Sequence, residues 1–176
     1  MQKRVCSHKT RFVAFVATSV DGRISLATRT LPDWISKEDE RFFQNSLSRV
    51  DAVIVGRNTY RAAAARLRAR TTFVFSNHLK TVQRRGTVTF VNPAHIDFTE
   101  LFRQYKTVAV LGGGAVYHAL LERNLLDEIY ITIEPLIFGR GNAMFIGCVR
   151  TKRLRLLSVR RLNRTGTLLL HYKINN

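Results

Sequence analysis

The sequence contains few of the residues that crosslink proteins or anchor them in membranes. Its 176 residues include only two cysteines, Cys6 and Cys148, which lie far apart and form no CxxC pair. This argues against a disulfide framework or a cysteine metal site and favours a reducing cytosol. No apolar run approaches the length of a membrane span, and the N-terminal residues lack the apolar stretch of a signal peptide. We therefore expect a cytoplasmic globular protein.

Several catalytic motifs are also missing. The chain has no HExxH, no GxSxG, no P-loop and no GxGxxG dinucleotide fingerprint. It lacks the H-x-E and P-C-x-x-C set that a zinc deaminase requires. We expect no metal site, because the five histidines share no ligand spacing. They are His8, His78, His95, His118 and His171.

Acidic residues are scarce. Asp and Glu number 12 against 29 Lys and Arg, which gives a net charge of +17, and no acid follows Glu134. Such a charge attracts polyanions, so nucleic acid is the first partner to consider. However, basic and apolar residues alternate between Arg153 and Arg161, as they do on the solvated face of a sheet. A generally cationic surface and a nucleic-acid-binding face therefore both remain open at this point.

The residues that are present indicate one packed domain. Hydrophobic residues make up 45% of the chain and mean hydropathy is −0.08. A chain of this length can bury roughly 70% of its unfolded surface. No linker or internal repeat divides it, so we expect a basic N-terminal tail at residues 1–10 and a single domain at residues 11–176.

Strand and helix patterns alternate along that domain. Helices are predicted from an N-cap at Ser36 to about residue 49, at 58–67, at 98–105 and at 115–123. The turn composition of residues 163–166 predicts a hairpin between the last two strands. Together these predict an α/β fold with a mainly parallel sheet, helices on both faces and an antiparallel C-terminal hairpin. Strands are predicted at residues 12–18, 52–55, 72–75, 88–91, 107–111, 127–133, 153–161 and 167–174.

Three strand ends carry residues suited to phosphate, and ligands of such sheets bind at the carboxyl ends of the strands. Gly112, Gly113 and Gly114 lead directly into a helix. Glycines let backbone N–H groups approach a phosphate, and a helix N-terminus adds a positive dipole end. The same three glycines would also suit a simple tight turn.

The other two junctions are Gly56-Arg57-Asn58-Thr59 and Ser76-Asn77-His78. An arginine and a hydroxyl at a helix start suit a phosphate monoester, because a guanidinium binds phosphate through two parallel hydrogen bonds. Alternatively, the first junction is a helix cap with an exposed arginine and the second an ordinary loop.

Several motifs occur in a fixed order along the chain. They are Thr18-Ser19-Val20-Asp21-Gly22-Arg23-Ile24-Ser25, Asp33-Trp34-Ile35-Ser36, Val55-Gly56-Arg57-Asn58-Thr59-Tyr60, Gly112-Gly113-Gly114-Ala115, Leu126-Asp127-Glu128-Ile129, Pro135 and Gly139-Arg140-Gly141. With these motifs the sequence resembles the dihydrofolate-reductase-like superfamily, and it is most similar to the reductase domain of the bifunctional riboflavin-biosynthesis deaminase–reductase and its stand-alone relatives. The resemblance spans about residues 11–174.

The resemblance implies a three-layer fold, an NADPH cofactor and a homodimer. By position, Ala17 and Ile24 would line the nicotinamide end, and Trp34 would pack on the cofactor. Asp33 and Ser36 would face the substrate. The cofactor phosphates would be approached by Gly56, Arg57, Thr59, Ser76, Gly112, Gly113, Gly114 and Ala115.

The expected function is hydride transfer from NADPH to a small heterocycle, namely a ribosylaminopyrimidine of riboflavin-type biosynthesis. Two departures bear on the substrate. Leu111 stands where those reductases carry an acid, and the stretch Leu47-Ser48-Arg49 lacks their arginine. A dihydrofolate or pteridine reductase is the alternative enzyme, and a basic nucleic-acid-binding protein that keeps the fold without its activity is the alternative of another class.

The first predicted helix separates the two enzymes. A dihydrofolate-type pocket uses a carboxylate on this helix to bind the pterin, and Glu38, Asp39 and Glu40 open it here. Asp39 and Glu40 are expected on the side that faces the core and the cleft. The other interpretation is that these acids only complement the helix dipole, which leaves the substrate to Asp33 and Ser36.

Overall fold

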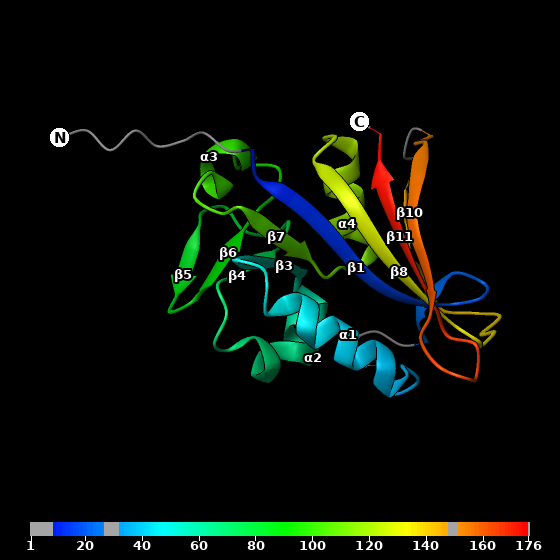
Figure 1. The fold of residues 1–176 in the computed structure, drawn as a ribbon. Coiled ribbons are helices and arrows are strands. Elements are labelled where there is room, and N and C mark those ends of the chain that lie inside the picture. Colours follow the sequence, from blue (N-terminus) through cyan, green and yellow to red (C-terminus); the bar gives the residue numbers. More distant parts are fainter. Residues whose placement is uncertain (1–8, 27–31, 148–150, 176) are drawn as a thin grey trace.

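A nine-stranded sheet forms the centre of the protein (Figure 1). The computed structural model describes residues 9–26, 32–147 and 151–175. The strands lie in the order β10-β11-β8-β1-β7-β3-β4-β6-β5. The five strands from β8 through β4 and their neighbour β6 run parallel, whereas β11, β10 and β5 are antiparallel to the strands beside them. The predicted mainly parallel sheet with an antiparallel hairpin is thus confirmed.

The strands of this sheet follow the predicted segments, with one short addition. The addition is β5 (Gln83–Arg85), an exposed edge strand that pairs with β6. The remaining bounds are β1 (Arg11–Ser19), β3 (Ala52–Gly56), β4 (Thr72–Phe75), β6 (Val88–Val91), β7 (Thr107–Val110), β8 (Leu126–Glu134), β10 (Leu154–Arg161) and β11 (Leu168–Ile174).

Two helices cover each face of the sheet, which gives the three layers (Figure 1). Helices α1 (Lys37–Leu47) and α2 (Arg57–Leu67) pack on one face, and α3 (Phe98–Phe102) and α4 (Gly114–Glu122) pack on the other. None of the helices in the described ranges has the length and apolar character that crossing a bilayer requires.

Strand β1 shows why the sheet is buried on both faces. Its alternate residues Phe12 and Ala14 belong to the core under α3 and α4, while Val13 and Phe15 belong to the core under α1 and α2. Successive side chains of a strand point to opposite faces, so a continuous apolar run fills two cores at once. This explains why the first strand reads as an uninterrupted hydrophobic segment.

Helix α3 is shorter than the sequence predicted. It ends at Phe102 and not near Tyr105, and the chain then turns toward β7. The carboxylate of Asp51 accepts hydrogen bonds from the backbone N–H groups of Lys106 and Thr107 at 2.8 and 2.9 Å. These bonds hold the start of β7 beside β3, and a longer helix would prevent them.

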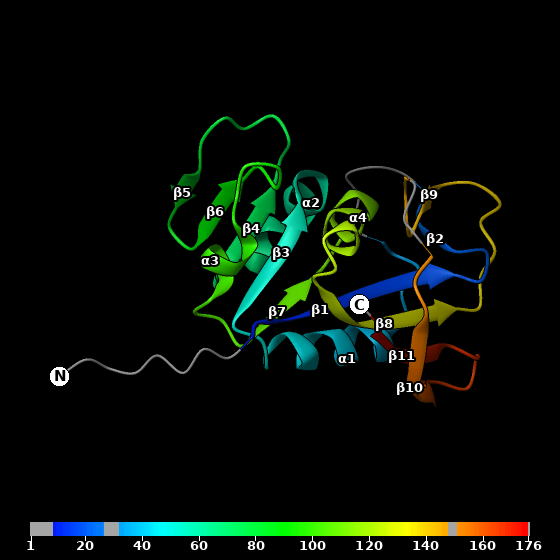
Figure 2. The same cartoon turned by 90° about the horizontal axis from the view of Figure 1, so that it is seen from above.

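A second, two-stranded sheet lies beyond the carboxyl end of β1 and next to α4 (Figure 2). It consists of β2 (Arg23–Ser25) and β9 (Asn142–Ala143). Neither strand was among the segments predicted from the sequence. Because they are only three and two residues long, they leave no periodic pattern for a sequence to show.

Candidate active site

A large cavity opens where the carboxyl ends of β1, β3, β4 and β7 meet, as expected for such a sheet. Its volume is about 1510 Å³. That exceeds the usual range for one small ligand and is large enough for a dinucleotide beside a second small molecule. Two regions of its wall differ in chemistry. We call them the glycine end (Gly56, Arg57, Gly113 and Gly114) and the acidic end (Asp33, Asp39, Tyr130 and Thr132).

The glycine end joins the N-termini of two helices. The N–H of Gly56, just before α2, donates to the carbonyl of Gly112, just before α4, at 2.7 Å. A Cβ atom at Gly56 would lie 3.2 Å from the Cγ2 atom of Val116 on α4, closer than such contacts normally are. The two helix starts therefore approach each other through a position that only glycine fits without displacement of its neighbour.

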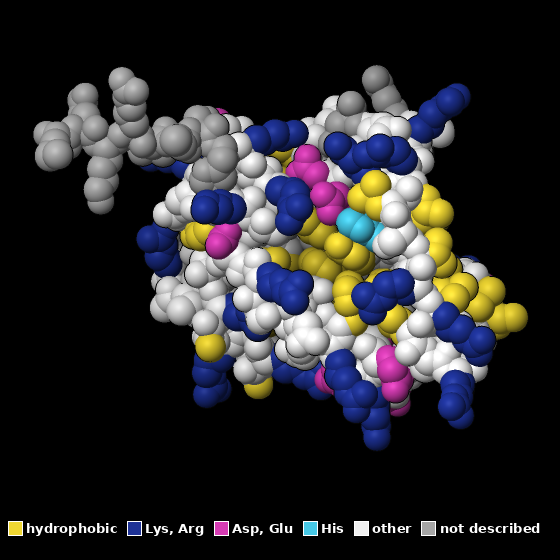
Figure 3. Space-filling model, viewed as in Figure 1, with side chains coloured by type: hydrophobic (Ala, Val, Ile, Leu, Met, Phe, Trp, Pro, Cys, Tyr) yellow, Lys and Arg dark blue, Asp and Glu magenta, His cyan; other side chains and the backbone are white. Residues whose placement is uncertain are grey.

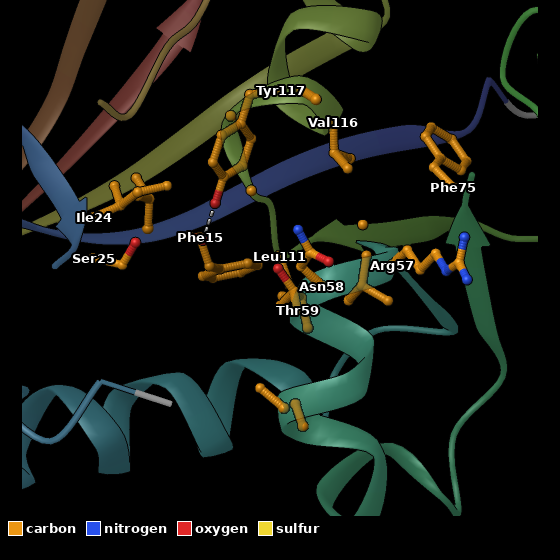
Figure 4. Close-up of a pocket in the computed structure, with 18 of the residues that line it drawn as sticks. Phe15, Ile24, Ser25, Arg57, Asn58, Thr59, Phe75, Leu111, Val116 and Tyr117 are labelled. Atoms are coloured by element: carbon orange, nitrogen blue, oxygen red, sulfur yellow. Dashed lines mark hydrogen bonds between the residues drawn. The ribbon is translucent and has the colours of Figure 1, made fainter. Parts of the chain in front are cut away.

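Gly112 holds the turn before α4. Its φ of +87° is unfavourable for residues with a side chain, and a Cβ there would lie 2.7 Å from the hydroxyl oxygen of Tyr117. That hydroxyl donates to the carbonyl of Phe15 at 2.8 Å (Figure 4). The peptide bond between Gly112 and Gly113 is cis. Gly112 thus shapes the wall from behind and does not itself line the cavity.

The glycine end fits the phosphates of a nucleotide cofactor. Neither helix has a side-chain cap, since the N-cap residues are Gly56 for α2 and Gly113 for α4. A Cβ at Gly113 would enter open space, with its nearest neighbour the Ile24 side chain at 3.9 Å. Uncapped backbone N–H groups and the positive ends of two helix dipoles favour an anion at this point.

Most residues predicted for the cofactor line this cavity. Figure 4 shows Ile24 on one side, and Arg57 extending from the start of α2 toward β4 on the other. Arg57 has no ion-pair partner among the described residues, so its guanidinium is available to a ligand. The predicted residues that line the cavity are Ala17, Ile24, Gly56, Arg57, Thr59, Ser76, Gly113, Gly114 and Ala115.

Trp34, in contrast, lies outside the cavity wall. Its ring packs edge-on against Phe138, with ring centroids 5.1 Å apart. Phe138 belongs to the loop after β8, whose N–H groups at Phe138 and Gly139 donate to the Asp21 carboxylate at 3.1 and 2.9 Å. The hydrogen bond from the hydroxyl of Ser19, together with these two, lowers the pKa of Asp21 to about 2. The Asp21-Gly22 motif therefore ties two loops together near the cavity.

The two residues predicted to face the substrate differ in their position relative to the cavity. Asp33 lines the cavity, whereas Ser36 does not. The hydroxyl of Ser36 accepts from the N–H of Asp39 at 3.3 Å, which confirms the predicted N-cap of α1. Its own N–H donates to the carboxylate of Glu134 at 2.8 Å. Ser36 thus has two structural partners, and its contact with a substrate stays a prediction.

Asp39 is the acid of α1 that the structure singles out. Its side chain lines the cavity, is only 6% exposed and accepts a hydrogen bond from the hydroxyl of Thr132 on β8 at 2.6 Å. Burial raises the pKa of Asp39 to about 6, and the nearby Glu134 carboxylate acts in the same direction. Glu40 instead pairs with Arg66 at 3.2 Å on the surface. The helix-dipole explanation therefore accounts for Glu38 and Glu40 more fully than for Asp39.

Aromatic rings complete the acidic end. Phe15 and Tyr130 stack with nearly parallel rings 5.2 Å apart, and Phe42 of α1 contacts both. The sequence analysis missed Thr132, Glu134 and Tyr130, because their alternation on β8 indicated only a half-buried strand. A polar face that runs along a strand opposite the apolar face of Ile129, Ile131 and Ile133 is the signal that would have found them.

Within the described residues, no three His, Cys, Asp or Glu side chains come together as a metal site would require. Cys6 lies outside the described residues, as does Cys148. The geometry therefore supports a site that holds an anionic cofactor by backbone groups and a second ligand by carboxyl and aromatic groups.

Comparison with known proteins agrees with this geometry. Residues 11–168 match the model of the RibD C-terminal domain. This chain belongs to that family. It is 27% identical over 154 residues to YwjB of Bacillus subtilis (strain 168), an uncharacterized protein, with 82% of this chain and 87% of YwjB covered.

Solved structures confirm the fold expected from the resemblance. RibD of Acinetobacter baumannii superposes with a TM-score of 0.77 at 18% identity, over 96% of this chain and 59% of RibD. Dihydrofolate reductase from Enterococcus faecalis, in complex with NADP(H), superposes with a TM-score of 0.66 at 22% identity, over 96% of this chain and 98% of the enzyme. The chain therefore has a dihydrofolate-reductase-like fold and spans only part of the length of RibD.

Proposed function

We propose that this protein is an NADPH-dependent reductase that transfers a hydride to a small heterocycle, an aminopyrimidine of the riboflavin-biosynthesis type. The observation that carries the proposal is the single cavity that joins two uncapped helix N-termini to a buried carboxyl group. Membership of the RibD C-terminal domain family supports a reductase that acts on a pyrimidine.

The chain's own residues would bind and orient the cofactor. Backbone groups of Gly113 and Gly114 at the start of α4 would hold the pyrophosphate, and Arg57 would approach the adenosine phosphates with Thr59 and Ser76. NADPH supplies the hydride once bound. Ile24 and Ala17 line the part of the wall that would surround the nicotinamide. Their apolar side chains would exclude water from the reacting atoms.

The acidic end would hold the heterocycle. Phe15, Phe42 and Tyr130 give this wall an apolar aromatic lining against which a planar heterocycle would pack. Tyr130 would contribute its ring edge, because Phe15 and His171 stack against its ring. Asp33 and Asp39 supply polar contacts at the same wall. A carboxyl group with a pKa of about 6 exchanges protons near neutral pH. Asp39 is therefore suited to provide the proton that accompanies the transferred hydride.

A dihydrofolate or pteridine reductase is a second candidate, and one observation favours it. A carboxylate on the first helix of a dihydrofolate-type pocket binds the pterin, and Asp39 is buried at such a position with Thr132 as its partner. Leu111 supports the same candidate, because it lines the cavity at the position where the riboflavin branch would have an acid.

A binding assay decides among these substrates. Protein at fixed concentration would be titrated with NADPH and NADH, and the cofactor complex then with ribosylaminopyrimidines and dihydrofolate, followed by turnover assays. We expect NADPH to bind and a ribosylaminopyrimidine to be reduced. Rapid reduction of dihydrofolate alone would establish the second candidate, and failure of both cofactors to bind would exclude a reductase.

The nucleic-acid alternative finds less support in the structure. Lys and Arg side chains are spread over the face shown in Figure 3 and are not gathered into one stripe. Strand β10 is exposed along its whole length and contributes Arg155, Arg160 and Arg161, but no aromatic residue. A groove that binds single strands combines positive charge with aromatic side chains on which bases stack.

We also propose a homodimer, formed through the C-terminal hairpin. Leu154, Leu156 and Val159 of β10 pair across the strands with Ile174, Tyr172 and Leu170 of β11, so they lie on the same sheet face as α4. These three side chains are 42%, 49% and 53% exposed. An apolar sheet face of this kind marks an interaction surface.

Light scattering tests this assembly. We expect about twice the 20.2 kDa monomer mass at micromolar concentration, and monomers for the double variant Leu156→Glu with Val159→Glu. Val82→Glu is the matched control, because Val82 is also exposed but precedes β5 at the far edge of the sheet. A monomeric wild type would refute the dimer.

A further inference from the structure

Glu134, the last residue of β8, is buried at a junction of three segments. It is 3% exposed, and its two carboxylate oxygens have different partners. One accepts from the N–H of Ser36, at the start of α1, at 2.8 Å. The other accepts from the hydroxyl of Thr167, just before β11, at 2.6 Å. No Lys, Arg or His in the described ranges forms an ion pair with it. A buried carboxylate without a cation is costly, so its retention needs a reason.

The tip of the C-terminal hairpin is fastened to the same place. Asn163 accepts from the N–H groups of Gly166 and Thr167 at 3.1 and 3.0 Å, which shapes the turn. Its amide nitrogen donates to the hydroxyl of Thr167 at 2.9 Å and reaches the carboxylate of Glu38 on α1 at 3.4 Å. The hairpin therefore contacts the first turn of α1 both directly and through Glu134.

The same bonds continue to the cavity wall. Ser36 is held by Glu134 through its N–H, and its hydroxyl accepts from the N–H of Asp39. The carboxyl of Asp39 accepts in turn from Thr132, two residues before Glu134 on the same face of β8. Two groups therefore fix the position of Asp39, namely Ser36 at the N-cap of its own helix and the hydroxyl of Thr132. Glu134 holds Ser36 in place.

We propose that Glu134 is a positioning residue for Asp39, which fixes the first turn of α1 against β8 and links the C-terminal hairpin to the acidic end of the cavity. The proposal rests on the proposed function in one respect, namely that Asp39 contacts the substrate. The link itself is a property of the folded chain and is measurable without any substrate.

Charge gives Glu134 a second effect on Asp39. Of the acids on α1, Glu38 is turned to Asn163 and Glu40 is paired with Arg66 of α2. The preceding loop contributes Asp33 to the same cavity wall, to which β1 and β8 contribute the uncharged residues Phe15 and Thr132. Burial has the largest effect and raises the pKa of Asp39. Among the charged groups, the negative charge of Glu134 raises this pKa further.

The first experiment measures this effect directly. The carboxyl carbon of Asp39 would be followed by carbon-13 NMR between pH 4 and pH 8 in the wild type and in Glu134→Gln, a variant that keeps the shape and removes the charge. We expect the midpoint to fall by roughly half a unit to one unit. Glu128→Gln is the control, because Glu128 lies on the same face of β8 but pairs with His171, and it should leave the midpoint unchanged.

The second experiment tests the mechanical link. Thr167→Val removes one of the two hydrogen bonds that Glu134 accepts and leaves the charge of Glu134 in place. Glu134→Leu removes both of these hydrogen bonds. We expect KM for the substrate to rise several-fold in the first and about tenfold or more in the second, while Kd for NADPH is unchanged. Glu134→Gln keeps one acceptor oxygen, so KM should rise no more than in Thr167→Val, and the alkaline fall of kcat/KM should move to lower pH together with the Asp39 midpoint.

The outcomes separate the two hypotheses. An Asp39 midpoint that is the same in the wild type and Glu134→Gln would refute the electrostatic effect, and an unchanged KM in Thr167→Val would refute the link. If no substrate is turned over but the NMR shift occurs, the proposed function fails and the positioning of Asp39 stands. If Glu134→Leu does not fold, Thr167→Val still decides the question.

Discussion

At the glycine end of the cavity, backbone groups and helix dipoles create the binding surface, whereas at the acidic end it is made of buried side chains from distant segments. Gly56, Gly113 and Gly114 act through what they lack, since a side chain would fill the space or displace a neighbour. Asp39, Thr132 and Glu134 act through carboxyl and hydroxyl groups that are removed from water. The first kind of surface suits a phosphate found in many ligands, and the second can distinguish one heterocycle from another.

The difference predicts where substitutions act. Changes at the glycine end should alter cofactor affinity for steric reasons and depend little on pH. Changes at the acidic end should alter proton binding, stability and substrate choice, because buried carboxyl groups respond to every change in their surroundings.

The largest effect is expected for Gly113→Val. The added side chain would enter the space above the α4 N-terminus, next to Ile24. NADPH affinity should fall at least about a hundredfold, or roughly 3 kcal/mol, as measured by isothermal titration. Gly113→Ala should lie between this variant and the wild type. Denaturant unfolding of each variant, run in parallel, separates loss of the site from loss of the fold. Unchanged affinity would place the phosphates elsewhere.

Arg57→Ala should come next. If its guanidinium binds the 2′-phosphate, the wild type prefers NADPH to NADH, and the variant loses most of that preference. A charge-assisted hydrogen bond contributes about 1.5–3 kcal/mol, which corresponds to roughly tenfold to a hundredfold in selectivity. Arg68, near the C-terminal end of the same helix and absent from the cavity wall, supplies the control Arg68→Ala. Equal binding of both cofactors by the wild type would remove Arg57 from this role.

Asp39→Asn should reveal the buried carboxyl through stability. The folded-state pKa of about 6 lies above the ordinary 3.8, so the folded protein holds the proton more tightly. The free energy of unfolding therefore falls as pH rises from about 4 to about 6. It should be lower at pH 7 by about 3 kcal/mol from this group alone. The asparagine variant should match the wild type near pH 4 and exceed it at pH 7.

Denaturant unfolding at several pH values measures this difference. The same variant tests the proton-donor role. If Asp39 supplies the proton, Asp39→Asn should lower kcat/KM with either class of substrate, whereas a reductase that relies on Asp33 would keep most of its activity. A wild type and variant with parallel pH dependence would show that the Asp39 carboxyl titrates normally.

The smallest effect is expected for Glu40→Gln. Glu40 lines the cavity, but its carboxylate is half exposed and pairs with Arg66 on the surface, where ion pairs contribute little. We expect kcat/KM to change by less than about tenfold. Asp33→Ala should lower it further than Glu40→Gln does. Steady-state kinetics measure both variants. If Glu40→Gln lowered kcat/KM more than Asp33→Ala, then Glu40 and not Asp33 would be the acid that contacts the substrate.

The two ends also differ in how far the sequence predicted them. The three glycines are contiguous, and they follow a buried strand and precede a helix, so local rules are enough to place them. Thr132 and Glu134 are 93 and 98 residues from their partners Asp39 and Ser36. No local pattern relates residues so distant, because their contact depends on the antiparallel and parallel neighbours of β8 in the sheet.

The sequence by itself determined the layers, the mainly parallel sheet and the phosphate-type junctions, because periodicity, glycines and helix caps are local properties of the chain. Only the tertiary structure decided which of three adjacent acids is buried. Asp39 lies against Thr132 of β8 while Glu38 and Glu40 turn to the hairpin and to α2. That choice depends on how α1 lies across the sheet, and a rotation of one residue along a helix, about 100°, separates a solvated acid from a buried one.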